Sequence, residues 1–101
     1  FGYFQELTRL YFNRIKGDSF QERASSFSKI RDSEGYSSSC EIDSENNITI
    51  IEYHSPYESI INDYPMVLAM EDQMIGKLFE ANVTRKDERA SGLVKYTFEL
   101  R

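Results

Sequence analysis

The hydrophobic pattern of the N-terminal part of the chain predicts two helices. Apolar residues recur every three or four positions between residues 3 and 16, and the stripe ends at Gly17, a residue type common at helix C-termini. Ser19 and Glu22 then have the spacing of a capping box, in which each side chain bonds a free backbone N–H group of the first turn. A second helix is therefore expected from Ser19 to about Asp32.

The pattern then changes to the alternation of a β-hairpin. Apolar and polar residues alternate at 36–42, a polar turn follows at 43–47, and a return strand is expected at 48–54. Because apolar residues occupy both faces of the return strand, we expect an inner strand that is covered on both sides.

A strand-to-helix corner is expected at Ser55. Serine followed by Pro56 suits the N-cap and the first position of a helix, and Glu58 has the capping-box spacing from Ser55. Pro65 should interrupt this helix. Its inward-facing residues are expected to be Tyr57, Ile60, Ile61 and Tyr64.

The C-terminal part predicts a longer helix and a second hairpin. The helix is expected at 66–80, the two strands at 83–87 and 94–100, and the turn between them at 88–92. The element order is then helix, helix, hairpin, helix, helix, hairpin. Hairpins linked by helices indicate an α+β fold, a two-layer domain with an antiparallel sheet of about four strands in two hairpins and helices packed on one face.

Length and composition bound the domain organisation. With 101 residues, of which 40% are hydrophobic, the chain fits one core. We divide it into an N-terminal helix at 1–17, serving as a linker or dimerisation element, and an α+β sensor or dimerisation domain at 18–101. Because the first residue is not Met, we interpret the chain as a piece of a longer protein. An aromatic face on the N-terminal helix favours a homodimer; it consists of Phe1, Tyr3, Phe4, Tyr11 and Phe12.

The residue composition argues against an enzyme. The chain has one His and one Cys, so a nucleophilic triad has only His54 to use, and Cys40 alone cannot form an internal disulfide or complete a metal-ligand set. No Gly-rich phosphate loop occurs among the five glycines. We expect no catalytic residue, no metal and no cofactor, and the lone cysteine favours a reducing, cytoplasmic location.

The charge distribution restricts the partners. The net charge is -5, and residues 32–76 contain ten acidic residues and no Lys or Arg. Since DNA binding requires clustered basic residues, we expect DNA contact only through another domain. These acids either solvate an exposed surface, which we expect for the pair Glu71 and Asp72, or attract a cation or a basic partner. No apolar run approaches the roughly 20 residues of a membrane span, so no membrane partner is expected.

The candidate ligand-binding residues are His54 and four tyrosines. His54 lies at the expected end of a strand, just before an expected helix, where functional side chains are common. Five tyrosines, Tyr36 and the four candidates named below, could line an apolar cavity with their hydroxyl groups. The alternative is an ordinary aromatic core whose hydroxyl groups reach the surface. The four tyrosines are Tyr53, Tyr57, Tyr64 and Tyr96.

A series of short motifs resembles one group of transcriptional regulators. The motifs are Arg23-Ala24, Glu34-Gly35-Tyr36, Ile50-Ile51-Glu52, Pro56-Tyr57, Tyr64-Pro65, Glu71 and Tyr96. In this order they resemble the C-terminal effector domain of winged-helix (ArsR/SufR-like) transcriptional regulators, a group that includes the repressor of iron-sulfur cluster biogenesis. The likeness covers about residues 19–100. It implies a sensor and dimerisation domain joined to an N-terminal winged helix that binds operator DNA as a dimer.

The chain departs from that group at the iron-sulfur ligands. Where cluster-binding relatives have cysteines, this chain has Ser55, Leu68 and, at about the third position, Val94. Thiolates are required to hold such a cluster, so the resemblance does not carry the cluster over. We expect a regulatory domain that senses a small-molecule effector, dimerises, or both. The alternative is a stand-alone small-molecule-binding or protein-interaction module.

Overall fold

Two helices form where the periodicity predicts them. In the computed structural model, which describes residues 2–101, α1 spans Gly2–Arg14 and α2 spans Phe20–Ser33. The capping box is confirmed: the Glu22 N–H donates to Ser19 Oγ over 3.0 Å, and the Ser19 N–H donates to Glu22 Oε1 over 3.1 Å. These bonds fix the start of α2 because they satisfy N–H groups that no helical carbonyl can reach.

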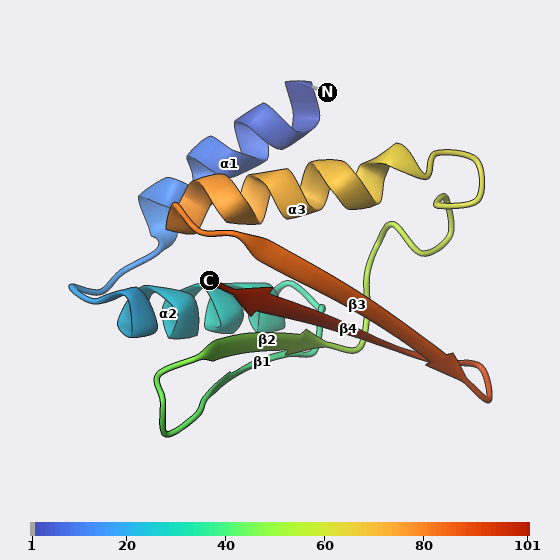
Figure 1. Cartoon of the computed structure of the whole chain (residues 1–101). Helices are drawn as coiled ribbons and strands as arrows, with labels where there is room; N and C mark the ends of the chain where they lie inside the picture. The colour runs from blue at the N-terminus through green and yellow to red at the C-terminus, as the bar shows by residue number, and fades with distance from the viewer. Residues whose placement is uncertain (1) are drawn as a thin grey trace.

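The four strands form one antiparallel sheet. β1 (Ser38–Ile42) pairs with β2 (Ile48–Glu52), and β3 (Val83–Ala90) pairs with β4 (Leu93–Leu100). A β2–β4 pairing joins the two hairpins, so the order across the sheet is β1-β2-β4-β3. The third helix, α3 (Met66–Phe79), lies between the hairpins in sequence and packs with the other helices (Figure 1). The predicted two-layer α+β fold with two hairpins is confirmed.

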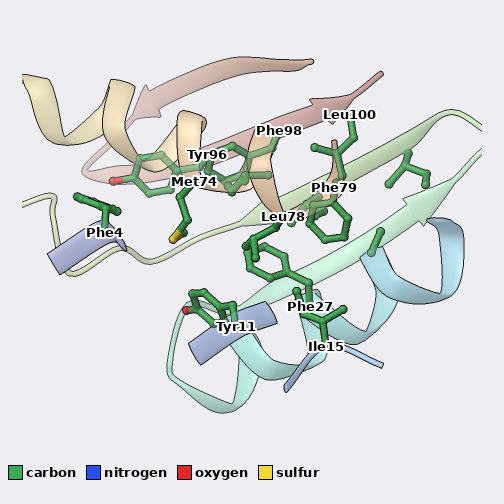
Figure 2. Packing of buried hydrophobic residues seen from close by; sticks show 14 of the residues in the cluster. Phe4, Tyr11, Ile15, Phe27, Met74, Leu78, Phe79, Tyr96, Phe98 and Leu100 are labelled. Carbon is green, nitrogen blue, oxygen red and sulfur yellow. The ribbon is translucent and has the colours of Figure 1, made fainter. Parts of the chain in front are cut away.

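One face of the sheet carries the core. Ile48 and Ile50 of β2 point toward the helices together with Tyr96, Phe98 and Leu100 of β4, and all five side chains are buried. Figure 2 shows aromatic and aliphatic side chains of the helices closing over these strands. The apolar residues that alternate along each strand therefore end up on one side, as their period of two requires.

The helices of residues 2–101 pack on this face only, so the prediction that β2 is covered on both sides is wrong. β2 is nevertheless an inner strand, between β1 and β4. Ile51 points to the open face and is only 8% exposed, since Ser39 and Thr97 flank it in the register. Tyr53, just beyond the strand, is 49% exposed.

α1 belongs to the same core as the sheet. It packs against α3 and α2, and its residues Phe4 and Tyr11 join the buried cluster (Figures 1 and 2). Two members of the aromatic face expected to dimerise are thus used inside the chain. Tyr3 and Phe12, from the same set, are exposed. Phe1 lies outside the described residues.

The helix expected after Ser55 does not form. Residues 56–63 are a series of turns, and between β2 and α3 the described chain contains no helix. Ser55 Oγ accepts the N–H of Tyr57, only two residues ahead, which makes a tight side-chain turn in place of an N-cap. Glu58, expected to reach back to the cap, instead bonds Arg89 of β3. A tertiary ion pair therefore replaces the local capping interaction.

The residues expected to face inward from that helix separate accordingly. Tyr57 is buried and Ile61 is half-buried, whereas Ile60 and Tyr64 are exposed. Without a helical backbone, residues three or four positions apart no longer share one side. The expectation is therefore wrong for Ile60 and Tyr64.

The second hairpin is longer and tighter than predicted. β3 continues to Ala90, and only Ser91 and Gly92 form the turn. Their φ angles are positive, 53° and 78°, as required by the mirror-image turns that suit the twist of a hairpin. Residues 88–95 continue past the end of β2, and we call them the hairpin arm (Figure 1).

Replacing Gly17 by Ala is expected to destabilise the fold more than Gly35→Ala. Both glycines have positive φ, 130° and 95°, where a Cβ costs roughly 1–2 kcal/mol. Only at Gly17 would the new Cβ also collide with the chain, because it would lie 2.7 Å from Cβ of Glu22. Urea unfolding of both variants measures the difference. Equal losses would show that the α1–α2 junction tolerates the extra methyl group.

Candidate functional site

A fully buried arginine links α2 to the sheet and to α3. The Nε and Nη2 atoms of Arg31 donate to the two carboxylate oxygens of Glu52 over 3.0 and 2.7 Å. Nη2 also donates to Glu71 Oε2 over 2.8 Å. The planar, forked guanidinium suits this geometry, since it can meet both oxygens of a carboxylate at once. One side chain thereby holds β2 and α3 against α2.

Glu71 shares its carboxylate between two arginines. Its second oxygen accepts a hydrogen bond from Arg85 Nη1 of β3 over 3.0 Å. Arg85 also bonds Asp72 and Asp87, each over 3.0 Å. We call the whole set the buried charge network; its members are Arg31, Glu52, Glu71, Asp72, Arg85 and Asp87. The network ties both hairpins to the helices.

Aromatic rings pack against both guanidinium groups. The Cζ atom of Arg31 lies 3.6 Å from the ring centroid of Tyr36, a close cation–π stack. Arg85 Cζ lies 5.4 Å from the centroid of Tyr96 and 5.1 Å from that of Phe98. These rings exclude water, so the ion pairs act in a low effective dielectric.

The buried charge network has four carboxyl groups for two arginines. Burial raises the pKa of the Glu52 carboxyl, although its hydrogen bonds to Arg31 oppose the change. Burial also raises the pKa of Asp72, again against the effect of an arginine. For Arg31, burial by itself lowers the pKa, but Glu52 more than offsets this and the guanidinium stays charged. Burial thus favours the neutral form of Glu52 and of Asp72 more than it would for exposed carboxyl groups.

The expectation that Glu71 and Asp72 are solvated is wrong for Glu71, which is 1% exposed, while Asp72 is half-buried. A signal for this was present in the helical period. The inward stripe of α3 includes Val67, Glu71, Met74 and Leu78. Arg31 likewise follows Phe27 by four residues on the apolar side of α2. A charged residue at a core-facing position of an apolar stripe can therefore indicate a buried ion pair, and not only an interruption of the stripe.

A groove lies next to the network at the end of the sheet. It has a volume of about 360 Å³ and runs between the segment after α2 and the segment after β2. We call it the Tyr36 groove; its lining residues are Glu34, Gly35, Tyr36, His54, Ser55, Pro56, Glu58 and Val94. Tyr36 connects the groove with the network, because the same ring stacks on Arg31.

A second groove adjoins the first along the hairpin arm. It has a volume of about 470 Å³ and shares His54 and Val94 with the Tyr36 groove. We call it the Tyr53 groove; its lining residues are Tyr53, His54, Glu88, Arg89, Ala90, Leu93, Val94 and Lys95. Leu93, which is 76% exposed, and Tyr53 give it an apolar wall.

Three of the five candidate residues lie at or next to these grooves. His54 lines both, and Tyr53 lines the Tyr53 groove. Tyr96 is buried in the core, but its hydroxyl donates to Glu58, which lines the Tyr36 groove. The carboxylate of Glu58 also binds Arg89, and these hydrogen bonds hold the pKa of Glu58 below its usual range.

The other two candidates lie elsewhere. Tyr57 packs beside α1, where its hydroxyl donates to the Tyr3 hydroxyl over 3.0 Å, and burial raises its pKa. Tyr64 is exposed and lines neither groove. Both were placed with His54 on the assumption of a helix after Ser55, and the turns observed there separate them.

Most residues that line the Tyr36 and Tyr53 grooves are not predicted by the sequence pattern. Tyr36 is among the tyrosines expected to line a cavity but not among the five candidates, and Glu58 is expected only as a capping residue. Arg89 falls in the expected turn, and Leu93 falls in no expected element. No local pattern marks these residues as neighbours, because they come from three separate segments that meet only when β2 pairs with β4.

Within residues 2–101, no three His, Cys, Asp or Glu side chains are grouped so as to hold a metal ion. Cys40 is half-buried on β1, and burial raises the pKa of its thiol. Over the same residues, no helix has the length and apolar character needed to cross a bilayer.

Comparison with known proteins identified no relative: a scan against models of protein families, a search of curated proteins and a search of solved structures each found no match to this chain. The resemblance to the effector domains of ArsR/SufR-like regulators therefore stays a prediction.

Replacing Arg31 by Met is expected to destabilise the protein by about 3–5 kcal/mol, because Glu52 would be buried without a counter-charge and Glu71 would keep only Arg85. The double variant Arg31→Met/Glu52→Gln should recover part of the loss, since it removes one uncompensated charge. Arg9→Met, which breaks an exposed pair on α1, should change stability little. Chemical denaturation measures all three. A loss no larger than that of the control would mean that the network does not hold the layers together.

Asp72→Asn is expected to gain stability relative to the wild type as the pH rises from about 4 to 7. Burial raises the pKa of Asp72, so its favourable contribution is present at low pH and lost as it ionises. Asparagine keeps an oxygen that can accept from Arg85 and never ionises. Melting temperatures across this range provide the measurement, with Asp63→Asn, an exposed carboxyl, as the control. A pH-independent difference between Asp72→Asn and wild type would contradict the prediction.

Proposed function

We propose that this chain is a ligand-responsive regulatory module of the type expected in the effector half of an ArsR/SufR-like winged-helix regulator. The observation that carries the proposal is the stacking of Tyr36 on Arg31 at 3.6 Å. Through this ring, a small molecule in the Tyr36 groove would contact the buried charge network that joins α2, β2 and α3.

Binding in this groove would couple to the arrangement of the layers. A displacement of the Tyr36 ring would uncover Arg31, which is fully buried, and a buried ion pair tolerates few geometries. An effector that binds one arrangement better than another shifts the population toward it. α1 packs on both α2 and α3, so it would carry the shift toward the end of the chain where the resemblance implies a DNA-binding winged helix.

The polar groups of the Tyr36 groove suit binding better than catalysis. Ser55 Oγ already accepts the N–H of Tyr57, and Glu58 is engaged by Arg89. A nucleophilic serine needs a general base within hydrogen-bond reach, and in the part of the chain that the structure describes the one hydrogen bond found for Ser55 Oγ comes from a backbone N–H. Fixed polar groups around an apolar surface are, in contrast, typical of ligand pockets.

The proposal includes a cytoplasmic homodimer that contacts operator DNA through a separate winged helix. Support for the dimer comes from α1, where Tyr3 and Phe12 are exposed although Phe4 and Tyr11 of the same aromatic face are buried. Light scattering should give twice the mass of the chain, and Phe12→Ser should shift the mass toward the monomer. A monomeric mass at high protein concentration would contradict the dimer.

The alternative, a stand-alone protein-interaction module, is favoured by one observation. Leu93 projects from the hairpin arm and is 76% exposed, an uncommon position for a large apolar side chain unless a partner covers it.

Thermal-shift screening with a metabolite collection tests the effector site. A compound bound in the Tyr36 groove should stabilise the chain by about 2.7 kcal/mol at a concentration one hundred times its Kd. His54→Ala should abolish that shift, since His54 lines both grooves. Tyr64→Ala, an exposed aromatic residue outside both grooves, is the matched control and should leave it unchanged.

A shift that survives in His54→Ala, or disappears equally in Tyr64→Ala, would place the ligand elsewhere. If no compound stabilises the chain, the ligand-sensing part of the proposal fails and only dimerisation is left to be tested.

A further inference from the structure

β4 is longer than the strand beside it. It pairs with β3 over its whole length, from Leu93 to Leu100, but its pairing with β2 stops at Glu52 opposite Tyr96. Residues 93–95 therefore have a strand on one side only. Figure 1 shows the hairpin arm extending past the end of β2.

The backbone of Val94 faces this unpaired side. In a hairpin with a two-residue turn, the residues that flank the turn form a hydrogen-bonded pair, here Ala90 and Leu93. Antiparallel ladders alternate between partners, so the N–H and C=O groups of Leu93 and Lys95 point to β3 and those of Val94 point away from it. Val94 thus offers one donor and one acceptor at the spacing that an added strand uses.

The two grooves lie on either side of this backbone. Side chains of a strand alternate between faces, so Val94 points to the helix side, where the Tyr36 groove lies, and Leu93 and Lys95 point to the open face. Leu93 and Lys95 line the Tyr53 groove. An extended chain beside β4 would send alternate side chains into the two grooves in the same way.

Charge distinguishes the two grooves. The charged residues that line the Tyr36 groove are both acids, Glu34 and Glu58, each paired at its outer side with one arginine. These two acids, the buried charge network behind Tyr36 and the arginines paired with them comprise six carboxyl groups and four guanidinium groups. This groove therefore favours a basic side chain, whereas the apolar wall formed by Tyr53 and Leu93 favours an apolar one.

We propose that an extended peptide segment of a partner protein binds as an added strand at the exposed edge of β4. The peptide residue opposite Val94 is basic and enters the Tyr36 groove, and the residues on either side of it are apolar and cover Tyr53 and Leu93. The peptide backbone bonds the N–H and C=O groups of Val94. This inference rests on the proposed function, because it uses the same surface around His54. It identifies the effector as a peptide.

The test is an amide-detected NMR titration with the capped pentapeptide Thr-Val-Arg-Val-Thr. The largest shifts are expected at Val94 and His54, with smaller ones at Leu93. Replacing the central Arg of the peptide by Glu should weaken binding about tenfold or more, since like charges then face each other across the groove. Methylating the backbone nitrogen of that Arg should weaken it by up to about tenfold, because one strand-to-strand hydrogen bond is lost.

Two protein variants separate the arm from general surface hydrophobicity. Leu93→Ser should weaken peptide binding severalfold. Ile42→Ser removes an exposed apolar residue of β1 that pairs with Ile48, at the end of β2 away from Val94, and should leave binding unchanged. Both positions are exposed, so both variants should fold, and their amide spectra report on this directly.

Each outcome decides the inference. Absence of shifts at Val94, equal binding of the Arg and Glu peptides, or equal effects of Leu93→Ser and Ile42→Ser would overturn it. Concentration-dependent shifts at Val94 without peptide would overturn it in favour of a second copy of the chain. If a metabolite binds at His54 and no peptide binds, the inference fails and the proposed function stands. If the peptide binds and no metabolite does, the inference stands and the proposed function loses only its small-molecule effector.

Discussion

The position of each layer depends on the buried charge network. Arg31 of α2 reaches both Glu52 of β2 and Glu71 of α3, and Glu71 extends the contact to Arg85 of β3. Each ion costs several kcal/mol to remove from water, and its partners offset this cost only in the geometry that pairs them. The pairing is incomplete, because Arg31 Nη1 and Arg85 Nη2 are buried without a hydrogen-bond partner among the described residues. We therefore interpret the network as selecting one arrangement of helices on the sheet, while the apolar core supplies most of the stability. The stacked rings of Tyr36 and Tyr96 belong to this arrangement, because they cover the two guanidinium groups.

A line of contacts connects the network with the protein surface. Arg85 packs on Tyr96, the Tyr96 hydroxyl donates to Glu58, and Glu58 binds Arg89 in the hairpin arm. The same line explains why residues 56–63 form turns, since Glu58 cannot cap a local helix and bind Arg89 at once. Where it reaches the surface, the Tyr36 and Tyr53 grooves meet. A ligand there would contact a surface that the buried charges hold in place.

The candidate site was only partly predictable. His54 and Tyr53 lie at the grooves because they directly follow β2, a strand that the sequence predicts up to residue 54 and that ends at Glu52. Tyr57 and Tyr64 were assigned to the site through a helix that local capping signals favoured and tertiary contacts prevented. Burial of Glu71 was visible as a charged residue in phase with an apolar stripe, but its two partners were not, since Arg31 lies 40 positions away and Arg85 14.

The sequence by itself determined the helices α1, α2 and α3, the two hairpins and the α+β class, because periodicity, caps and turn residues act within a few positions of one another. It also determined that the chain has one histidine and one cysteine, since these counts follow from composition. Only the tertiary structure decided the β2–β4 pairing, the partners of the buried arginines, the loss of the helix after Ser55 and the extension of the hairpin arm. Those features depend on which side chains from distant positions come into contact. A buried charge is tolerated only where a charged partner contacts it, and the local sequence does not specify that partner.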